Sequence, residues 1–521
     1  MLEKKVESLA IEFLEHGADL AIGIPGTGPV LDFLSYYVKH GGTFWLCRHE
    51  ASAPIIAGTI GKRENKPIIS LCANGTARTN LLSGITHCWF EKLPVIALWD
   101  CYEYSAPKHQ RLQRLPEHDF SPFYNMLLSG FCEQEEGIGK LLVQASLKPD
   151  YGPVALNLRM SKNPLHEFQD RKISNCDTVV DFKVDRKYER PIIIFGSAVT
   201  RGGQAEEVIR TFSEIPIPKL TTIGAKGLFS EKDEYNLRVF TGVGGVNTPE
   251  KRILKQADLI IGINLRHSDV ISVKPFGKYT ILFDTELYDE ADGFESKQYI
   301  IHSFENIREK ISEISDPKWT SEECQSLMRE AEEAILQEEN QSGILLHFAS
   351  KELFGKTTVV VDDGIFQKQS EYFWLTEHYT QYVATGVGRN MGSALPAAIG
   401  LALRYPQENI VCLTGDGGLP MFLGELSMLM ERPHGNLLII HFADFSLATM
   451  KIRRLDNIDP LVRIPTSYCE IVKGFGIKAK TTDSIGVAIE QIINWNKSSG
   501  DLFLEFKLNK EVYADTFFMI R

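Results

Sequence analysis

The most constraining feature of this sequence is an aspartate between two glycines at the end of an apolar run. Residues 409–414 read as a buried strand, and Gly415, Asp416 and Gly417 follow it directly. Such an ending puts a carboxylate at the carboxyl edge of a parallel sheet, where the glycines let a phosphate approach the backbone. Asp444 follows the next apolar run, after an interval with room for a helix and a returning strand. The pattern predicts a site at which a hard cation holds a diphosphate.

Strand-like and helical patterns alternate along the whole chain, which predicts an α/β protein with parallel sheets. A chain of 521 residues is too long for one hydrophobic core. We expect three α/β domains, at residues 1–170, 185–320 and 340–521. The polar stretch 165–186 is expected to be a linker. The acidic helix 321–340, with charged residues around most of its circumference, is expected to bridge two domains. Other expected elements are helices at 3–16 and 51–61 and strands at 191–196, 257–262, 279–283 and 357–361.

Composition and charge limit the classes of partner. The formal net charge is −12 at pH 7, and nucleic acid requires a cationic face, so we expect no nucleic-acid partner. The first residues lack the apolar core of a signal peptide, and no apolar run reaches membrane-spanning length, which favours a cytoplasmic protein that does not enter membranes. The nine cysteines are scattered and form no Cys-x-x-Cys pair, so neither a disulfide framework nor a zinc site is expected.

Several separate stretches resemble the thiamine diphosphate enzymes, in the branch that contains 2-oxo acid decarboxylases and acetolactate synthases. The segment 415–444 is similar to the family's diphosphate and magnesium motif, and residues 386–403 are similar to the stretch that cups the middle of the cofactor. Four segments resemble the family's pyrimidine domain: GIPGTGPVLDFL (23–34), RHEASA (48–53), NGTARTNLLSGI (74–85) and YGPVALNL (151–158). The resemblance implies a pyrimidine-binding, a central and a diphosphate-binding domain in chain order.

The resemblance also implies the cofactors, thiamine diphosphate and Mg²⁺, and the residues that hold them. Asp416, Asp444 and the backbone carbonyl of Ser446 would bind the metal, with diphosphate oxygens completing its shell. The diphosphate would lie on the amides of Gly417 and Gly418 at a helix start, where N–H groups and the helix dipole favour an anion. The implied cofactor-binding residues are Glu50, Gly364, Ile365, Phe366, Gly388, Arg389, Met391, Gly415, Asp416, Gly417, Gly418, Asp444, Phe445 and Ser446.

The chain departs from the family at the second metal ligand. The family usually has Asn there, whereas the aligned residue here is Asp444, preceded by Ala443. An Asp is a competent and more anionic ligand for Mg²⁺, but a shift of one residue would put Ala443 at the position and remove a ligand. The spacing of Arg432, Pro433 and the Asn-Leu pair 436–437 resembles the motif of phosphonopyruvate and sulfopyruvate decarboxylases, which favours Asp444.

Two residues are expected to control the reactive form of the cofactor. Glu50 holds the position of the family's catalytic glutamate, which hydrogen-bonds N1′ of the pyrimidine and favours the imino tautomer that removes the C2 proton. The alternative is a solvent-facing Glu that caps helix 51–61. Met391 holds the position of the apolar wedge that bends the cofactor, although a Met in an apolar segment is more often core filling. The glycine spacing in 386–392 does not fit a dinucleotide fingerprint.

Three further residues are candidates for substrate chemistry. His109 stands in Lys-His-Gln where related decarboxylases have two adjacent His residues, and is a candidate catalytic proton relay; a solvated loop histidine is the alternative. Thr27, in the first loop, and Arg78, in a glycine-rich turn, are candidates to face a substrate carboxylate. A surface Arg is the alternative for Arg78.

The sequence therefore favours an enzyme that decarboxylates a 2-oxo acid and can join the remaining fragment to a second carbonyl compound. An acetolactate synthase-like enzyme, a flavin-dependent 2-oxo acid oxidase and a catalytically silent paralogue stay open as alternatives, although the central stretch shows no clear flavin signature. The resemblance implies at least a homodimer, and a homotetramer as a dimer of dimers, with each cofactor between two subunits. The small and apolar segment 393–403 is expected to pack between subunits.

Overall fold

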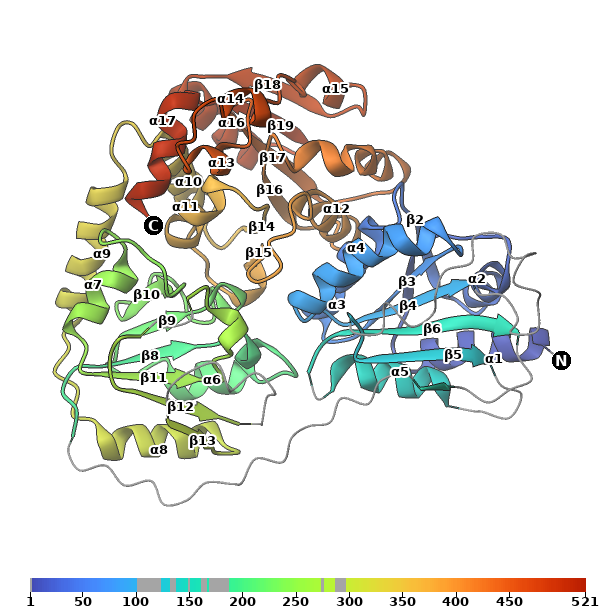
Figure 1. The fold of residues 1–521 in the computed structure, drawn as a ribbon, viewed down its shortest axis with the longest axis horizontal. Helices are drawn as coiled ribbons and strands as arrows, with labels where there is room; N and C mark the ends of the chain where they lie inside the picture. The colour runs from blue at the N-terminus through green and yellow to red at the C-terminus, as the bar shows by residue number, and fades with distance from the viewer. Residues whose placement is uncertain are drawn as a thin grey trace. The chain divides into compact units, whose positions relative to one another are not determined.

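The computed structural model describes residues 2–100, 123–131, 137–148, 150–160, 166–167, 187–272, 276–285 and 297–521. Its strands form three sheets, and each sheet comes from one consecutive part of the chain (Figure 1). The three α/β domains expected from the alternating pattern are confirmed. The expected linker, 165–186, lies almost entirely outside the described residues.

The first sheet has seven strands in the order β2-β1-β3-β4-β6-β5-β7. All neighbours are parallel except β7, which pairs antiparallel with β5. The strands are β1 (Leu20–Ile24), β2 (Thr43–Leu46), β3 (Ile68–Cys72), β4 (Val95–Asp100), β5 (Met126–Phe131), β6 (Pro153–Met160) and β7 (His166–Glu167). The helices are α1 (Leu2–Glu15), α2 (Pro29–Lys39), α3 (Ser52–Glu64), α4 (Thr76–Phe90) and α5 (Ile138–Leu147).

Helix α1 shows how the sequence pattern specifies this layer. Val6, Leu9, Ala10 and Phe13 recur at helical spacing, and all four are buried in the core beside β1 and β3. The observed helix agrees with the expected range 3–16 to within a residue at each end.

The central sheet is wholly parallel, in the order β10-β9-β8-β11-β12-β13. Its strands are β8 (Pro191–Phe195), β9 (Lys219–Thr221), β10 (Asn236–Val239), β11 (Leu259–Ile263), β12 (Thr280–Asp284) and β13 (Lys297–Ile300). Its helices are η3 (Ser197–Thr200), α6 (Ala205–Phe212), η4 (Ile223–Ala225), α7 (Pro249–Gln256), η5 (His267–Asp269) and α8 (Phe304–Ile314). Strand β11 starts two residues later than expected. Just before it, the Asp258 carboxylate accepts hydrogen bonds from the amides of Glu189 and Arg190.

Helix α9 (Ser321–Ile335) leads from the central sheet to the third. Cys324 and Leu327 pack in the central core, whereas Ile335 packs with Tyr372 and Phe373 of the third domain. The helix therefore bridges the two domains as expected. The expectation that charge surrounds most of it is corrected, because an apolar stripe at helical spacing is buried.

The third sheet is also wholly parallel, in the order β15-β14-β16-β17-β19-β18. Its strands are β14 (Thr357–Val361), β15 (Tyr382–Ala384), β16 (Asn409–Gly415), β17 (Asn436–Ala443), β18 (Lys478–Thr482) and β19 (Leu502–Lys507). Its helices are α10 (Gln341–Glu352), α11 (Ile365–Phe373), η7 (Tyr379–Gln381), α12 (Ala394–Arg404), η8 (Leu419–Glu431), α13 (Ala448–Lys451), α14 (Asp459–Val462), α15 (Cys469–Lys473), α16 (Ile485–Lys497), α17 (Lys510–Asp515) and η9 (Thr516–Met519).

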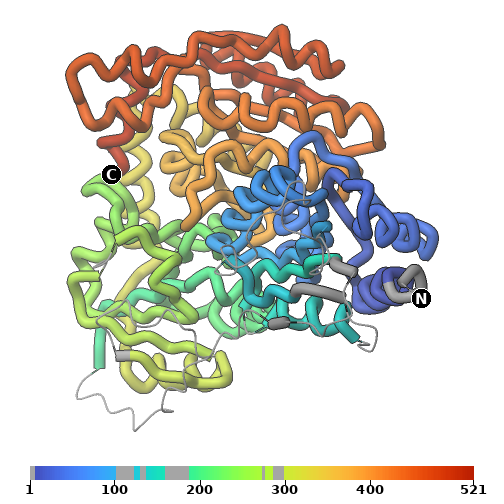
Figure 2. Tube along the Cα trace, turned by 45° about the vertical axis from the view of Figure 1, so that its right-hand side comes forward, coloured from blue at the N-terminus to red at the C-terminus, as the bar shows by residue number. Residues whose placement is uncertain are grey.

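The chain forms two compact units that do not follow the order of the sequence. The first comprises residues 1–172 with two segments from far along the chain, 388–406 and 422–434. The second comprises residues 173–387, 407–421 and 435–521. The central and third sheets therefore belong to one unit, and two pieces of the C-terminal third belong to the other (Figure 2).

Helix α12 packs against α3 inside the first unit. Every residue from Ala394 to Leu403 is buried, and a Cβ at Gly400 would lie only 2.4 Å from Cγ2 of Ile56, so glycine permits this close approach. Arg404 at the end of α12 donates hydrogen bonds to Glu64 at the end of α3. The expectation that segment 393–403 packs between subunits is therefore corrected, since the helix is buried against its own chain.

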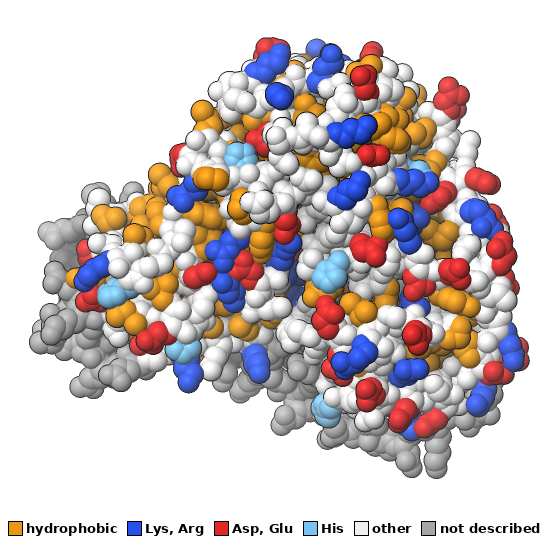
Figure 3. Space-filling model, turned by 180° about the vertical axis from the view of Figure 1, so that it is seen from behind, with side chains coloured by type: hydrophobic (Ala, Val, Ile, Leu, Met, Phe, Trp, Pro, Cys, Tyr) orange, Lys and Arg blue, Asp and Glu red, His pale blue; other side chains and the backbone are white. Residues whose placement is uncertain are grey.

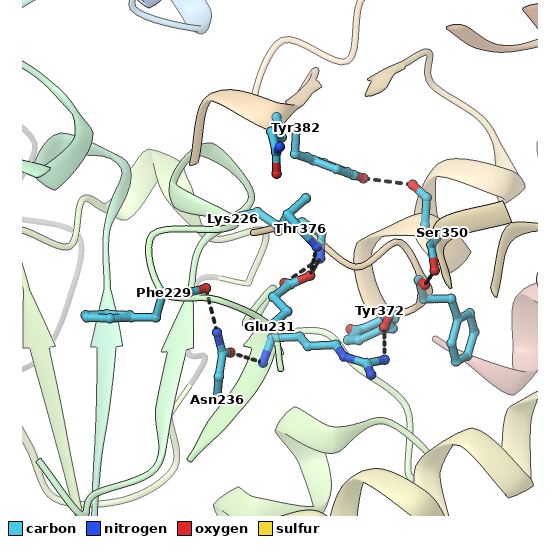
Figure 4. Close-up of polar contacts among 12 residues, drawn as sticks. Lys226, Phe229, Glu231, Asn236, Ser350, Tyr372, Thr376 and Tyr382 are labelled. Carbon is cyan, nitrogen blue, oxygen red and sulfur yellow. Dashed lines mark hydrogen bonds and ion pairs between the residues drawn. The ribbon is translucent and has the colours of Figure 1, made fainter. Parts of the chain in front are cut away.

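A buried ion pair of the central domain lies where that domain contacts the third domain, within the second unit (Figure 4). The ammonium of Lys226 donates to both oxygens of Glu231, at 2.5 and 2.7 Å, and both side chains are fully buried. Glu231 also accepts from the amide of Thr376 at 3.0 Å, and its own amide donates to the Thr376 carbonyl at 3.0 Å. Burial lowers the pKa of Lys226, and the charge of Glu231 opposes this effect.

The surface and the helices bear on the expected partners. On the face drawn in Figure 3, acidic and basic side chains are interspersed. Among the described helices, none combines the length and the apolar character needed to cross a membrane. The six cysteines that the structure describes are buried and form no disulfide bonds, and they include Cys72 in β3 and Cys412 in β16.

Candidate active site

Asp416 and Asp444 lie at the carboxyl ends of two neighbouring strands. Strand β16 pairs with β17 in parallel register, so the residues that follow the two strands leave the same edge of the sheet. The amide of Phe445 donates to Oδ2 of Asp416 at 2.7 Å, which ties the two loops together. Ala443 is the last residue of β17 and is fully buried. Ala443 has no side-chain oxygen and lies within the strand, whereas Asp444 is the residue that follows it, so Asp444 stays the predicted second ligand.

The two carboxylates are buried close to one another. Burial, with a smaller contribution from the charge of Asp416, raises the pKa of Asp444 to about 7, while the hydrogen bond that the Ser446 hydroxyl donates to Asp444 opposes the rise. Two adjacent buried carboxylates disfavour their charged forms. A divalent cation between them would reverse this effect, because it attracts both charges.

One carboxylate oxygen of Asp416 is buried without a hydrogen bond from any residue that the structure describes. Oδ1 is buried, and in the described part of the chain it accepts no hydrogen bond. It lies 3.2 Å from Nε2 of His441 without the alignment of a hydrogen bond. Buried carboxylate oxygens are normally paired, so an unpaired one fits a position that coordinates a cation.

The donor set suits Mg²⁺ bound together with a diphosphate. Across the described ranges, no group of three or more His, Cys, Asp or Glu side chains is placed to hold a metal alone. Two carboxylates and the Ser446 carbonyl would leave positions for diphosphate oxygens, which is how Mg²⁺ is usually bound. A cavity of about 580 Å³ adjoins this loop; it is lined by Asp444, Phe445, Ser446, Lys451, Asp459, Pro460, Arg463, Pro465, Leu508 and Lys510.

The turn after Asp416 leads into helix η8, as the diphosphate role of Gly417 and Gly418 requires. The helix begins at Leu419 in 3₁₀ geometry and has a kink at Phe422, where φ is −131°. A helix start of this kind still presents free N–H groups to an anion. The roles of Gly417 and Gly418 stay predictions.

The loop at residues 363–366 fits a diphosphate contact only in part. Gly415 and Gly364 both face the ring of Phe366, and added Cβ atoms would lie 3.0 and 2.4 Å from it. The side chains of Ile365 and Phe366 are buried in the core. The amide of Phe366 donates to the Tyr513 hydroxyl at 3.1 Å, so it is used within the chain, and the cofactor contacts of Gly364, Ile365 and Phe366 stay predictions.

Glu50 lies in the turn between β2 and α3, half-buried. Its Oε2 accepts a hydrogen bond from the Asn80 side chain at 3.0 Å. Ala51 is the residue before α3, and no side chain caps that helix at this position. The alternative interpretation of Glu50 as a helix cap is therefore wrong, and its catalytic role stays a prediction.

The loop that bears Met391 has an unusual backbone. Arg389 has a φ of +44° and Gly392 a φ of +92°, which is rare for a long side chain and common for glycine. The amide of Gly388 donates to the Glu91 side chain at 2.8 Å, which anchors the start of the loop to the end of α4. Met391 is half-buried. The start of the loop is thus anchored to the end of α4, and the Met391 side chain is partly exposed.

The two substrate candidates that the structure describes differ in burial. Thr27 is exposed, at the carboxyl end of β1. Arg78 is buried in α4, with its guanidinium carbon 4.6 Å from the centre of the Trp99 ring. This stacking corrects the alternative of a surface Arg. His109 lies outside the described residues.

Two acidic residues close to the predicted positions were not foreseen. Asp100, at the end of β4, accepts from the amide of Val30 at 2.8 Å, and an added Cβ at Gly26 or Gly28 would collide with its carboxylate. The glycines around Thr27 were the available signal for this approach. The second is Glu425, which follows the Gly-Asp-Gly motif and contacts the Glu50 turn; no local pattern indicated that contact.

The central domain bears on the flavin alternative. Its strand order reverses between β8 and β11, the point at which such sheets bind nucleotides. The first amide after Gly196, that of Ser197, donates to Asp269 at 2.8 Å. A carboxylate therefore takes the donor that would face a phosphate, which argues against a dinucleotide at this point.

Comparison with known families matches all three domains. The model of the thiamine pyrophosphate enzyme N-terminal TPP binding domain matches residues 4–120, that of the central domain residues 186–286, and that of the C-terminal TPP binding domain residues 362–505. The three matches follow the order of the three sheets.

Curated relatives align along most of the chain. A probable acetolactate synthase large subunit of Methanocaldococcus jannaschii is 22% identical over 491 residues, covering 82% of this chain and 78% of the relative. The acetolactate synthase isozyme 3 large subunit of Escherichia coli K12 is 21% identical over 558 residues, covering 98% and 94%. The isozyme 1 large subunit of the same organism is 24% identical over 476 residues, covering 81% and 78%.

Proposed function

Because the chain belongs to the thiamine pyrophosphate enzyme family, we propose that it uses thiamine diphosphate and Mg²⁺ to decarboxylate a 2-oxo acid and to join the remaining fragment to a second carbonyl compound. The observation that carries this proposal is the pair Asp416 and Asp444 at adjoining strand ends, with one Asp416 oxygen left for a cation. The acetolactate synthase relatives support the carboligation step.

The residues of this chain divide the work between binding and proton control. Asp416, Asp444 and the Ser446 carbonyl would hold Mg²⁺, and Gly417 and Gly418 would receive the diphosphate whose charge such a cation offsets. Bound thiamine diphosphate supplies the electron sink for decarboxylation. Glu50 would accept a hydrogen bond from N1′ of the pyrimidine and so control the tautomer of the cofactor. Met391 would contact the cofactor from the position of the apolar wedge.

A panel of 2-oxo acids tests the proposed reaction. The purified protein, supplied with thiamine diphosphate and Mg²⁺, is incubated with each acid, with and without an aldehyde or a second 2-oxo acid, and the products are identified by mass spectrometry. A coupled hydroxyketone product is expected only when an acceptor is present. An aldehyde as the sole product would indicate a simple decarboxylase. Tight cofactor binding without turnover of any acid would contradict the proposal and favour a silent paralogue.

Glu50→Gln is expected to keep the fold and most of the cofactor affinity but to slow C2 deprotonation severely. The amide still reaches N1′, yet it cannot stabilise the protonated ring. General acid–base groups contribute about 10²–10⁴-fold, so we expect a loss in this range. Hydrogen–deuterium exchange at C2 of the bound cofactor is the measurement, and an unchanged rate would remove Glu50 from the mechanism.

We further propose that two subunits share each cofactor, so the active unit is at least a homodimer. Mixing Glu50→Ala subunits with Asp416→Ala subunits should then regenerate one intact site per dimer and recover activity that neither variant has alone. Each variant mixed with itself is the control. Full activity from a monomer, measured by light scattering, or no recovery after verified subunit exchange, would contradict the shared site.

A further inference from the structure

Glu425 is a buried carboxylate that contacts the turn bearing Glu50 from far along the chain. It belongs to η8, and only 1% of its surface is exposed. Oε1 accepts from the amide of His49 at 2.9 Å and from the amide of Arg48, 377 residues away, at 3.0 Å. Oε1 also lies 2.7 Å from the hydroxyl of Ser52. These groups belong to one compact unit.

The contacts enclose Glu50 on both sides. His49 precedes it, and Ser52 begins helix α3 two residues later. The amides of Arg48 and His49 are used by the carboxylate rather than by a strand or by the helix. The Glu425 carboxylate binds backbone amides of the turn directly, and hydrogen bonds to a charged acceptor are strong. Glu425 therefore sets the position of the main chain from which Glu50 extends.

The local charges agree with this arrangement. Burial raises the pKa of Glu425, and the hydrogen bonds from Ser52, Arg48 and His49 oppose that rise. Burial also raises the pKa of Cys47 to about 12, and the charges of Glu425 and Glu50 both contribute. Both carboxylates therefore lie near the same thiol, one on the buried side of the turn and the other half-buried.

A second set of contacts to the same turn lies nearer the surface. The Arg48 side chain donates to the Ser427 hydroxyl at 2.8 Å and to the Glu431 carboxylate. The side chains of Arg48 and Glu431 are 27% and 46% exposed. An exposed pair of this kind contributes little, so Glu431 offers a matched control: it is on the same helix, has the same charge and contacts the same turn, but not its amides.

We propose that Glu425 is a positioning residue for Glu50: it holds residues 48–52 so that the Glu50 carboxylate meets N1′ of the cofactor in the reactive geometry. The inference rests on the proposed function, since it needs Glu50 to act on thiamine diphosphate. It makes the segment after the Gly-Asp-Gly motif responsible both for the diphosphate turn and for the alignment of the catalytic carboxylate of the same chain.

The test measures C2 exchange of thiamine diphosphate bound to Glu425→Ala, Glu425→Gln and Glu431→Gln. A displacement of about 1 Å in a catalytic group costs about 10²-fold, so Glu425→Ala should slow exchange by this amount. Glu425→Gln keeps one acceptor oxygen without its charge and should fall between Glu425→Ala and wild type. Glu431→Gln should exchange at the wild-type rate. Cofactor affinity, by titration calorimetry, and the melting temperature are measured on each variant.

The outcomes separate positioning from structural support. Slower exchange with cofactor affinity within a few-fold of wild type is expected. A wild-type exchange rate in folded Glu425→Ala would overturn the proposal, and so would slowing that only follows lost affinity. If Glu425→Ala does not fold, Glu425→Gln decides, and a wild-type rate in it overturns the proposal. Glu50→Gln is the reference: if it too exchanges normally, the proposed function fails rather than the positioning alone.

Discussion

Asp416→Ala is expected to abolish retention of thiamine diphosphate, and with it all activity. The change removes the carboxylate whose Oδ1 is left for a cation and whose Oδ2 holds the loop after β17 through the Phe445 amide. Loss of a residue that merely supports a metal ligand costs about 10–100-fold in affinity, so loss of the ligand itself should exceed 10²-fold. Cofactor content after gel filtration, measured by mass spectrometry, and Mg²⁺ titration provide the measurement.

Substitutions at Asp444 are the matched control for this prediction. Asp444→Ala should behave like Asp416→Ala, whereas Asp444→Asn should be mild because it keeps an oxygen ligand and restores the residue usual in the family. It also removes one of two buried charges that disfavour each other. Normal cofactor and Mg²⁺ binding by Asp444→Ala would show that the ligand assignment at the end of β17 is wrong.

Breaking the buried pair between Lys226 and Glu231 is expected to give the largest loss of stability. Lys226→Met leaves the Glu231 carboxylate fully buried without its counter-charge, and Glu231→Leu leaves the ammonium in the same state. Removal of one partner of a buried ion pair costs about 3–5 kcal/mol. Urea unfolding, followed by circular dichroism, measures the change in the free energy of unfolding.

The double variant Lys226→Met with Glu231→Leu tests whether the loss of stability in each single variant comes from the unpaired charge. We expect it to be more stable than either single variant, because no unpaired charge stays buried. Lys318→Met is the control, since Lys318 pairs with Asp316 at 2.7 Å on the surface, where an ion pair contributes little. A Lys226→Met variant as stable as this control would show that the buried pair does not support the contact between the two domains.

The fold was largely predictable because its signals are local. Runs of apolar residues such as 357–361 and 409–414 became buried strands, and the helical spacing in α1 placed its apolar side chains on the core. Boundaries moved where a side chain bound the backbone, as Asp258 does before β11. Helix α9 was predicted to carry charge around most of its circumference because four buried residues are few among many charges, although their spacing is regular.

A site was predictable from the sequence where its residues directly follow strand ends. Asp416 and Asp444 each follow a strand, and parallel pairing brings neighbouring strand ends to one edge, so their proximity followed from the pattern. The buried stacking of Arg78 on Trp99 and the use of the Phe366 amide by Tyr513 did not, because each depends on a partner from a distant segment.

The sequence by itself determined three α/β domains, the family resemblance and the two carboxylates of the proposed metal site, because glycine geometry and hydrophobic periodicity act over a few residues. Only the tertiary structure decided that segments 388–406 and 422–434 join the N-terminal unit and that Glu425 holds the turn of Glu50. Packing decides which backbone amides lie close enough to a carboxylate to donate to it. An interval of 377 residues leaves no local signal of that contact.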